Sequence, residues 1–275
     1  MAKSAMKIGV IVPLTEEVSA EFEKAKQLGF ASCQLTCWDM SLYTKELAEK
    51  TLEASRRTGV EISALWCGWP KPAVWDFQEG YATLGLVPPA FRYARMEALL
   101  AGSDFGAMLG VTDIVTHVGF IPENPNDPEY AGVVSVVKYI AKRCKQNGQY
   151  FLFETGQETP ITLKRMMDDS GMDNLGVNLD PANLLLYGKA NPVDALDILG
   201  PYVRGVHAKD GEYPANGKFL GQEKPLGQGR VNFPSLIARL KDFGYGGPIT
   251  IEREISGEQQ LKDILDAKRL LEELI

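Results

Sequence analysis

The sequence predicts one α/β domain over residues 1–275, built as a single (β/α)8 TIM barrel. Eight short apolar runs recur along 275 residues, or about 34 residues per unit, which suits a barrel of roughly 250 residues. Most runs follow a helix-like segment that ends in glycine. A doubly wound open sheet is the alternative, but it usually shows a glycine fingerprint after its first strand. Here the sequence at that point reads VPLTEE.

The apolar runs have the composition of parallel strands that are buried on both faces. In chain order they are KIGVIV (7–12), SCQLTC (32–37), EISALW (61–66), DIVTH (113–117), YFLFE (150–154), LGVNLD (175–180), RGVHAK (204–209) and PITIE (248–252). The first run is followed by Pro13 and lacks a cleavage signal, so we interpret it as a strand and not as a signal peptide.

Helix boundaries are also readable. Seven helices are predicted to end at a glycine in the left-handed conformation. These glycines are Gly29, Gly59, Gly110, Gly148, Gly171, Gly200 and Gly244. Asn191 before Pro192 predicts an N-cap with proline at the first helical position. Ser256 with Gln259 predicts a capping box for the last helix.

Two connections are too long to be plain loops. One runs from Cys67 to Pro89 and contains Trp69, Trp75, Phe77 and Tyr81, and the other runs from Asp210 to Val231. Both follow strands, so both fall on the face where TIM barrels carry their sites. The first is too aromatic for a freely solvated loop, which predicts a pocket wall or a contact within a homo-oligomer.

Composition and charge exclude several classes of protein. The chain is 45% hydrophobic and 24% charged, which excludes a mostly disordered chain. The formal net charge of −7 argues against a nucleic-acid partner. No apolar run approaches the roughly 20 residues of a membrane span. The four cysteines form neither a disulfide ladder nor a CxxC motif, which favours reduced thiols and a cytoplasmic protein.

Ionisable residues fall at the ends of four successive predicted strands. Glu154, Asp180, His207 and Glu252 lie 26, 27 and 45 residues apart, and no helical or local pairing explains this spacing. In a barrel, the carboxyl ends of consecutive strands meet on one rim. A single carboxylate after a strand is often a helix N-cap, and a single strand histidine is often structural. The four together predict a shared metal site.

Three carboxylates and one imidazole form a hard, oxygen-rich set of ligands. This set suits one divalent metal ion, Mn²⁺, Mg²⁺ or Co²⁺, in six-coordination. A structural zinc ion would need thiolates. Cys37 and Cys67 are the cysteines at strand ends, and we interpret them as small wall residues.

Other strand-end residues are candidates for substrate contact. His117 ends the fourth strand and can be a fifth ligand, a hydrogen-bonding partner of substrate or a structural residue; its position favours substrate contact. Lys209 in HAKD can bind a substrate oxyanion or pair with Asp210. Trp38 and Trp66 lie at the ends of the second and third strands, where they can pack the barrel or form an apolar wall for a sugar ring.

At these residues the chain resembles the xylose-isomerase-like barrel superfamily, and within it the sugar phosphate isomerase/epimerase group. The matching stretches are FLFETG, GVNLDPANLLLYG, GVHAKD, PLGQGRVNFPSLIARL and ITIERE. The resemblance covers nearly the whole chain in order and spacing. It implies a single divalent ion held by Glu154, Asp180, His207 and Glu252. Its motifs are specific for the fold and the metal site but poor for the substrate.

The resemblance also implies a mechanism. In the family epimerases two glutamates flank the sugar on opposite faces, and Glu154 and Glu252 match them. One removes a proton alpha to the carbonyl, a cis-enediolate forms, and the other returns a proton. The metal neutralises enolate charge, and the carboxylates do the acid–base work. The expected function is therefore a metal-dependent isomerase or epimerase of a small carbohydrate.

The sequence departs from the family pattern in places. Ketose 3-epimerases of this superfamily carry histidine three residues after the sixth-strand aspartate, where this chain has Asn183. Asparagine can hydrogen-bond a sugar hydroxyl but cannot shuttle a proton, which disfavours ketose 3-epimerase activity. Gln157 is expected to point at the pocket, and Glu158 to support the next helix start. No phosphate cradle is readable beyond Lys209 and Arg230.

Other functions remain open on the same scaffold. An inosose-type dehydratase would use the same enediolate to expel a β-hydroxyl, and a non-catalytic sugar-binding barrel would use the pocket alone. Endonuclease-IV-type nucleases bind three metals with several histidines, and this chain has two histidines.

Overall fold

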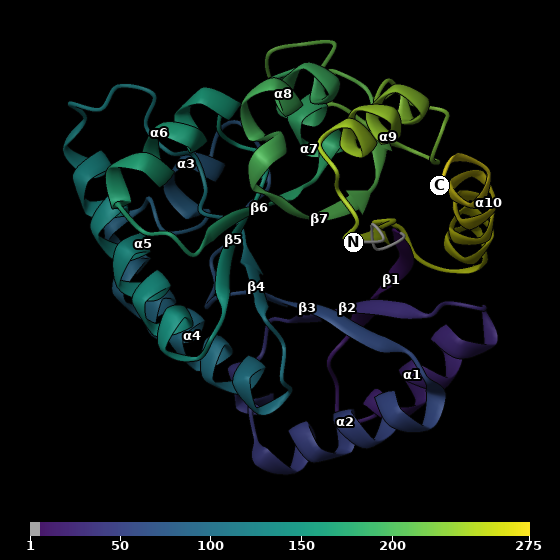
Figure 1. The fold of residues 1–275 in the computed structure, drawn as a ribbon. Coiled ribbons are helices and arrows are strands. Elements are labelled where there is room, and N and C mark those ends of the chain that lie inside the picture. Colours follow the sequence, from purple (N-terminus) through teal and green to yellow (C-terminus); the bar gives the residue numbers. More distant parts are fainter. Residues whose placement is uncertain (1–5) are drawn as a thin grey trace.

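The computed structural model describes residues 6–275, which form a closed barrel of eight parallel strands (Figure 1). The strands in chain order are β1 (Lys7–Pro13), β2 (Ser32–Cys37), β3 (Glu61–Cys67), β4 (Asp113–Thr116), β5 (Tyr150–Glu154), β6 (Leu175–Leu179), β7 (Val203–Ala208) and β10 (Pro248–Ile251). Strand β1 pairs with β2 on one side and with β10 on the other, which closes the ring. The predicted fold class is confirmed, and each predicted strand is within one residue of the observed one.

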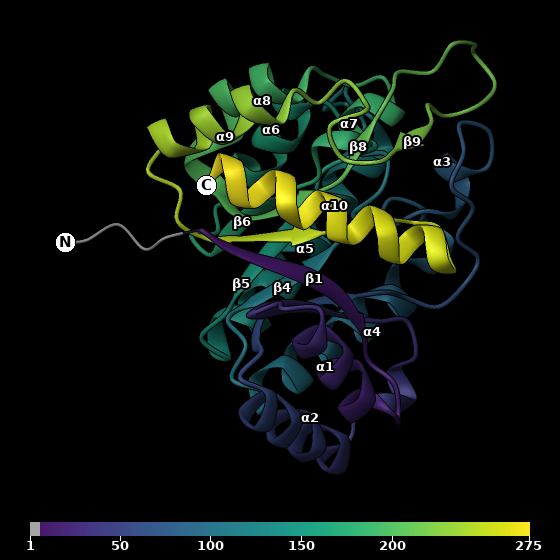
Figure 2. The same ribbon diagram turned by 90° about the vertical axis from the view of Figure 1, so that its right-hand side faces the viewer.

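Helices surround the barrel (Figures 1 and 2). The longer ones are α1 (Val18–Gln27), α2 (Lys45–Thr58), α4 (Pro89–Met108), α5 (Pro128–Gln146), α6 (Pro160–Ser170), α8 (Pro192–Leu199), α9 (Phe233–Asp242) and α10 (Glu258–Leu274). The shorter helices are η1 (Met40–Leu42), α3 (Gly80–Thr83), α7 (Pro181–Leu186) and η2 (Gly200–Tyr202). None of the helices in the described range is both long and apolar enough to span a membrane.

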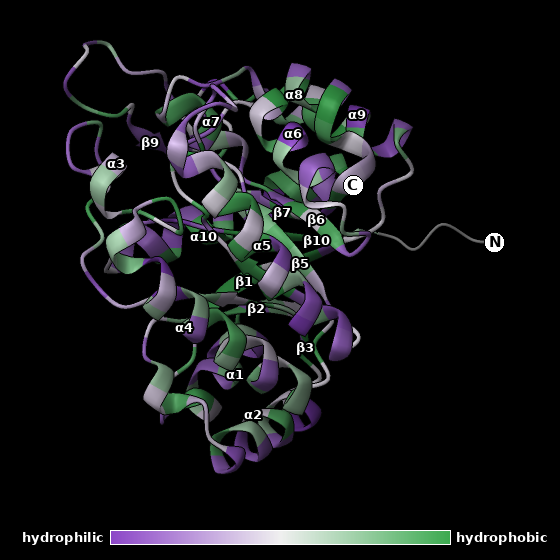
Figure 3. Cartoon of the chain, turned by 90° about the vertical axis from the view of Figure 1, so that its left-hand side faces the viewer, coloured by the Kyte–Doolittle hydropathy of each residue, from purple (hydrophilic) through white to green (hydrophobic). Residues whose placement is uncertain are grey.

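The hydrophobic core lies mainly between the sheet and the helices. Figure 3 shows hydrophobic colouring along the strands and mixed colouring on the outer helices. Leu35, Leu65 and Phe151 on the strands and Leu236 on α9 are buried in one continuous cluster. The four cysteines are buried and free, which agrees with the expectation of reduced thiols.

Six of the seven predicted glycines end their helices in the left-handed conformation, with φ between 64° and 77°. The prediction for Gly200 is wrong, because its φ of −48° and ψ of −45° are right-handed. The chain continues there directly into η2. An added Cβ on Gly200 would lie 2.6 Å from the Phe243 ring. Close packing against Phe243, and not a left-handed turn, is therefore what a larger residue at this position would disturb.

One of the two predicted helix starts is confirmed. The Asn191 side chain caps α8 by accepting hydrogen bonds from backbone N–H groups of its first turn. The predicted capping box at Ser256 is wrong, because α10 begins after Gly257, whose φ is 85°, and has no side-chain cap. Gln259 instead donates a hydrogen bond to Asp263 (2.6 Å) further along the same helix.

The two long connections are tied down by single buried side chains. Arg95 of α4 is fully buried and donates hydrogen bonds to the carbonyls of Gly85 (2.7 Å) and Pro72 (2.5 Å), at either end of the aromatic connection. The second connection contains a two-stranded sheet formed by β8 (Asp210–Gly211) and β9 (Glu223–Lys224).

The Asp210 carboxylate organises this second connection. It accepts hydrogen bonds from the backbone N–H groups of Gly227 (2.9 Å), Gly229 (3.0 Å) and Val231 (3.1 Å). Both connections therefore have fixed paths beside the carboxyl ends of β3 and β7.

Candidate metal centre

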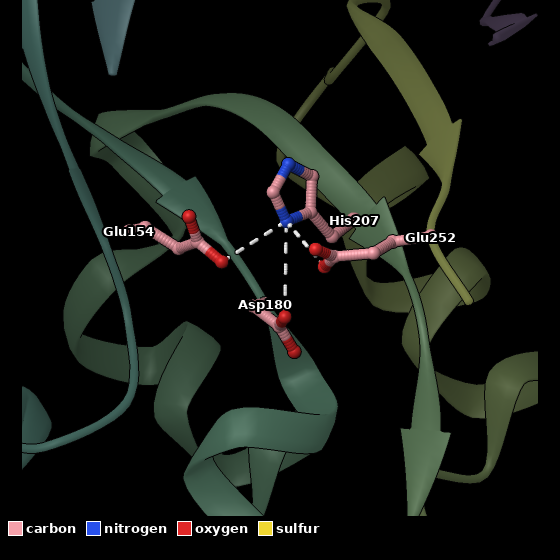
Figure 4. A group of neighbouring side chains, drawn as sticks. All are labelled: Glu154, Asp180, His207 and Glu252. Carbon is pink, nitrogen blue, oxygen red and sulfur yellow. Dashed lines mark ion pairs between the residues drawn. The ribbon is translucent and has the colours of Figure 1, made fainter. Parts of the chain in front are cut away.

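The structure brings together the four residues predicted at the strand ends. Glu154 ends β5, Asp180 follows β6, His207 lies in β7 and Glu252 follows β10. One ligand atom from each residue lies within 4.8 Å of those of the other three. Figure 4 shows Glu154 and Glu252 approaching from opposite sides, with Asp180 and His207 between them.

The polar atoms at the centre of this group lack ordinary partners. His207 Nδ1 lies 3.0 Å from Glu252 Oε2, 3.2 Å from Glu154 Oε1 and 3.7 Å from Asp180 Oδ2. His207 Nδ1, Asp180 Oδ2 and Glu252 Oε2 are buried and without a hydrogen-bond partner within residues 6–275. Burying such groups without hydrogen bonds is costly. Neighbouring ligands of an octahedral Mg²⁺ ion lie about 3 Å apart, given bonds of roughly 2.1 Å, so the donor set fits one divalent ion.

Gln34 of β2, which was not among the predicted residues, orients the histidine. His207 Nε2 donates to Gln34 Oε1 (2.6 Å), and Gln34 Nε2 donates to Asn178 Oδ1 (3.3 Å) across the barrel. This arrangement places the His207 proton on Nε2 and leaves Nδ1 facing the carboxylates, as is usual for histidines that bind metals. The available signal was a polar residue inside the otherwise buried strand SCQLTC.

Asp180 uses its two carboxylate oxygens for different purposes. Oδ1 accepts a hydrogen bond from the backbone N–H of Asn183 (2.8 Å) and so caps α7. Oδ2 faces the centre. The pKa of Asp180 is raised to about 6, chiefly because the carboxyl is buried, and the nearby Lys209 charge opposes that rise. The N-cap and the ligand position are thus compatible in one residue.

Glu154 is held at both oxygens. Trp66 Nε1 donates a hydrogen bond to Oε2, while His117 Nε2 (3.2 Å) and Asn183 Nδ2 (3.3 Å) approach Oε1. Burial alone would raise the pKa of Glu154, but the charges of His117 and His207 outweigh it and hold the pKa well below its usual value. Glu154 is therefore a fixed, ionised carboxylate.

Lys209 lies directly behind the centre. Its buried Nζ is 3.0 Å from Glu254, 3.5 Å from Glu252 and 3.6 Å from Asp180. Burial would lower the pKa of Lys209, but these carboxylates raise it well above its usual value. The alternative in which Lys209 pairs with Asp210 is wrong, because the Asp210 carboxylate is taken up by backbone N–H groups of its own connection.

A cavity of about 420 Å³ opens over the centre and is lined by Glu154, His207 and Glu252 but not by Asp180. Its lining residues are Ile11, Thr36, Trp38, Trp66, Trp75, His117, Glu154, Asn183, Leu186, Tyr187, His207, Leu220, Glu252 and Glu254. The candidates Trp38, Trp66, His117 and Asn183 thus reach the cavity, and Trp75 shows that the aromatic connection forms part of its wall. Glu254 and Leu220 also line the cavity and were not among the predicted residues.

Two expectations differ from the structure. Gln157 is buried and lines a neighbouring cavity that includes Phe120 and Lys189. Glu158 does not start α6, because Thr159 supplies the N-cap. Glu158 is buried as well, and burial raises its pKa to about 7, although the charge of His117 opposes the shift.

A family model described as a xylose isomerase-like TIM barrel matches residues 22–274. The crystal structure of a xylose isomerase domain protein from Planctomyces limnophilus is 33% identical, covers 98% of this chain and 97% of that chain, and superposes with a TM-score of 0.93.

More distant structures share the fold. A D-tagatose 3-epimerase-like protein is 22% identical, with coverage of 98% and 97% and a TM-score of 0.77. The probable 3-DHS dehydratase AsbF from Bacillus anthracis is 18% identical, with coverage of 97% and 99% and a TM-score of 0.69. The family-model match over most of the chain agrees with the closed barrel and with the resemblance seen in the sequence. The chain belongs to the xylose isomerase-like TIM barrel family.

Proposed function

We propose that this protein is a metal-dependent isomerase or epimerase of a small sugar or sugar derivative. The observation that carries the proposal is the four-residue centre beneath a cavity, with a glutamate on either side of it (Figure 4). The fold shared with a protein named for D-tagatose 3-epimerase supports a carbohydrate substrate.

Glu154, Asp180, His207 and Glu252 would hold one divalent ion, Mn²⁺, Mg²⁺ or Co²⁺. Bound there, the ion would supply Lewis acidity that stabilises negative charge on the sugar oxygens. The unpartnered buried atoms of three of these residues support this assignment.

The two glutamates would act as base and acid on opposite faces of the sugar. One removes the proton alpha to the carbonyl, and the other returns a proton to the cis-enediolate that results. Glu154 is held at both oxygens by its neighbours. The Glu252 side chain is 19% exposed, so its carboxylate is the more accessible of the two to substrate.

Neighbouring side chains would position the sugar. His117 and Asn183 line the cavity beside Glu154 and can hydrogen-bond hydroxyl groups. Trp38 and Trp66 provide apolar surface for the ring. Lys209 would balance the charge of the carboxylates from behind the centre. Gln157 would contact substrate only through the neighbouring cavity that it lines. Because Asn183 cannot shuttle a proton, the proposal does not specify ketose 3-epimerisation.

A second candidate is an inosose-type dehydratase, in which the same enediolate expels a β-hydroxyl. The fold shared with the probable dehydratase AsbF supports it. The third candidate function is that of a non-catalytic barrel that binds a sugar.

The test is to incubate the Mn²⁺-loaded protein with a panel of ketoses and inososes in D₂O and to follow the proton alpha to the carbonyl by NMR. Deuterium at that position with no loss of water supports the isomerase or epimerase. Deuterium with loss of water supports the dehydratase. A sugar that binds but exchanges no proton would leave only the binding role.

A further inference from the structure

The outer part of the cavity is aromatic. Trp66 lies deepest, is 6% exposed and contacts Glu154 through its Nε1. Trp38 follows at 5.0 Å between ring centroids. Trp75 lies 6.5 Å from Trp38 with its ring nearly perpendicular to it, and 5.1 Å from the His117 ring. Trp38 is 40% exposed and Trp75 is 37% exposed. An aromatic wall therefore runs from the metal centre to the mouth of the cavity.

The rings of this wall are held in place from behind. Fully buried Trp69 lies 5.4 Å from Trp38 and 6.3 Å from Trp75. A Cβ on Gly68 would lie 2.5 Å from the Trp38 ring, so the ring rests directly on the backbone. Two large indoles kept rigid and partly exposed at a cavity mouth are typical of a ligand-contacting surface.

The charge of the cavity disfavours a phosphate group on the sugar. Among the described residues that line it, three are glutamates and none is lysine or arginine. Lys209 beneath them is already surrounded by carboxylates. Lys71 outside lies 4.6 Å from the centre of the Trp38 ring and is not part of the lining. A phosphate group here would meet negative charge without a partner.

The volume leaves room beyond one sugar ring. Pockets of roughly 300–1,000 Å³ hold drug-sized ligands, and this one is about 420 Å³. We infer that the cavity takes an uncharged sugar that carries a second ring, a glycoside or disaccharide, with that ring against Trp38 and Trp75, and that it discriminates against phosphorylated sugars. The inference rests on the proposed function for the placement of the first sugar at the centre.

The test measures binding to the full-length, Mn²⁺-loaded protein by isothermal titration calorimetry. The probes are D-fructose, D-fructose 6-phosphate, and the neutral glucosyl-fructoses isomaltulose, maltulose and turanose. Isomaltulose carries its second ring on the oxygen that carries phosphate in fructose 6-phosphate. These two compounds therefore differ mainly in having a neutral ring or a charged phosphate at that oxygen. At least one glucosyl-fructose should bind about three- to tenfold more tightly than fructose. Fructose 6-phosphate should bind at least about tenfold more weakly than the best of them.

Substitutions test whether Trp75 provides the preference for a second ring. Trp75→Ala should remove the preference for the second ring, and Trp75→Phe should restore part of it. Tyr139→Ala, on an exposed aromatic residue of α5, should keep the preference. The inference is overturned if no glucosyl-fructose binds more tightly than fructose, if the phosphate binds best, or if Trp75→Ala behaves like Tyr139→Ala.

The same samples are followed in D₂O by NMR, which separates this inference from the proposed function. The predicted order of binding without any proton exchange supports the second-ring subsite and counts against the catalytic proposal. Proton exchange without a preference for the second ring supports the catalytic proposal and counts against the second-ring subsite.

Discussion

Replacing Lys209 by methionine tests how the acidic centre is balanced. Methionine keeps most of the volume and removes the ammonium group. That group is buried between Asp180, which has no exposed surface, and Glu252, at 3.6 and 3.5 Å. The third carboxylate beside it, Glu254, is 59% exposed, so solvent screens that pair and we leave it out of the energy.

Removing one partner of a buried ion pair costs about 3–5 kcal/mol. For a protein of this size 1 kcal/mol corresponds to roughly 2–4 °C, so the metal-free Lys209→Met variant should melt about 6–20 °C below wild type. A bound divalent cation restores positive charge beside the same carboxylates, so the loss should be smaller with Mn²⁺. For the same reason the variant should bind Mn²⁺ more tightly than wild type does.

The assay is thermal unfolding followed by circular dichroism, in EDTA and in Mn²⁺. The matched control is Lys145→Met, which removes an exposed lysine paired with Asp173 at 2.7 Å and should cost less than about 1 kcal/mol. The reasoning is refuted if the melting temperatures of the two variants lie within about 2 °C of each other in EDTA. It is also refuted if Mn²⁺ does not reduce the difference between these melting temperatures.

Three further predictions follow from the same centre and its surroundings. Saturation with Mn²⁺ at about 100 times its Kd should stabilise the protein by about 2.7 kcal/mol, seen as a rise in melting temperature that EDTA reverses. On the true substrate, Glu154→Gln and Glu252→Gln should keep the fold and some metal but lose about 10²–10⁴-fold in turnover. One of them should still exchange the alpha proton in D₂O, and near-normal turnover would remove that residue from the mechanism. Glu158 has a pKa of about 7 in the folded protein against an ordinary 4.5, so the folded state binds this proton more tightly than the unfolded chain. The stability that this proton contributes is present below about pH 4.5 and is lost as the pH rises through about 7. The free energy of unfolding in urea should therefore change in favour of Glu158→Gln over wild type by about 1–3 kcal/mol between pH 4.5 and pH 8. Glu53→Gln, at an exposed residue, should show no such change.

The barrel was readable from the sequence because each strand is a short apolar run and most of these runs follow a helix end. The metal centre was readable for a related reason. Parallel strands in a barrel place their carboxyl ends on one rim, so strand order alone predicts that Glu154, Asp180, His207 and Glu252 meet. Long-range topology was encoded here in local patterns.

The contacts around the centre were not readable in this way. The hydrogen bond from His207 to Gln34 joins β7 to β2 across the barrel, and no spacing along the chain indicates it. The direction of Gln157 depends on how the segment after β5 packs. The start of α10 after Gly257 and the right-handed Gly200 likewise depend on the neighbours that pack there, which the sequence does not specify locally.

The double use of Asp180 limits how this part of the chain can change in length. Strand β6 ends at Leu179 and helix α7 begins at Pro181, so one residue is at once the whole connection, the helix cap and a candidate ligand. An insertion or deletion there would shift the carboxylate, the cap and the cavity-lining Asn183 together. The connections after β3 and β7 are long and anchored by separate side chains, so they can vary in length with the four ligands in place. Within this barrel, differences in substrate among relatives should therefore arise from those two connections, while the β6–α7 junction keeps a constant length.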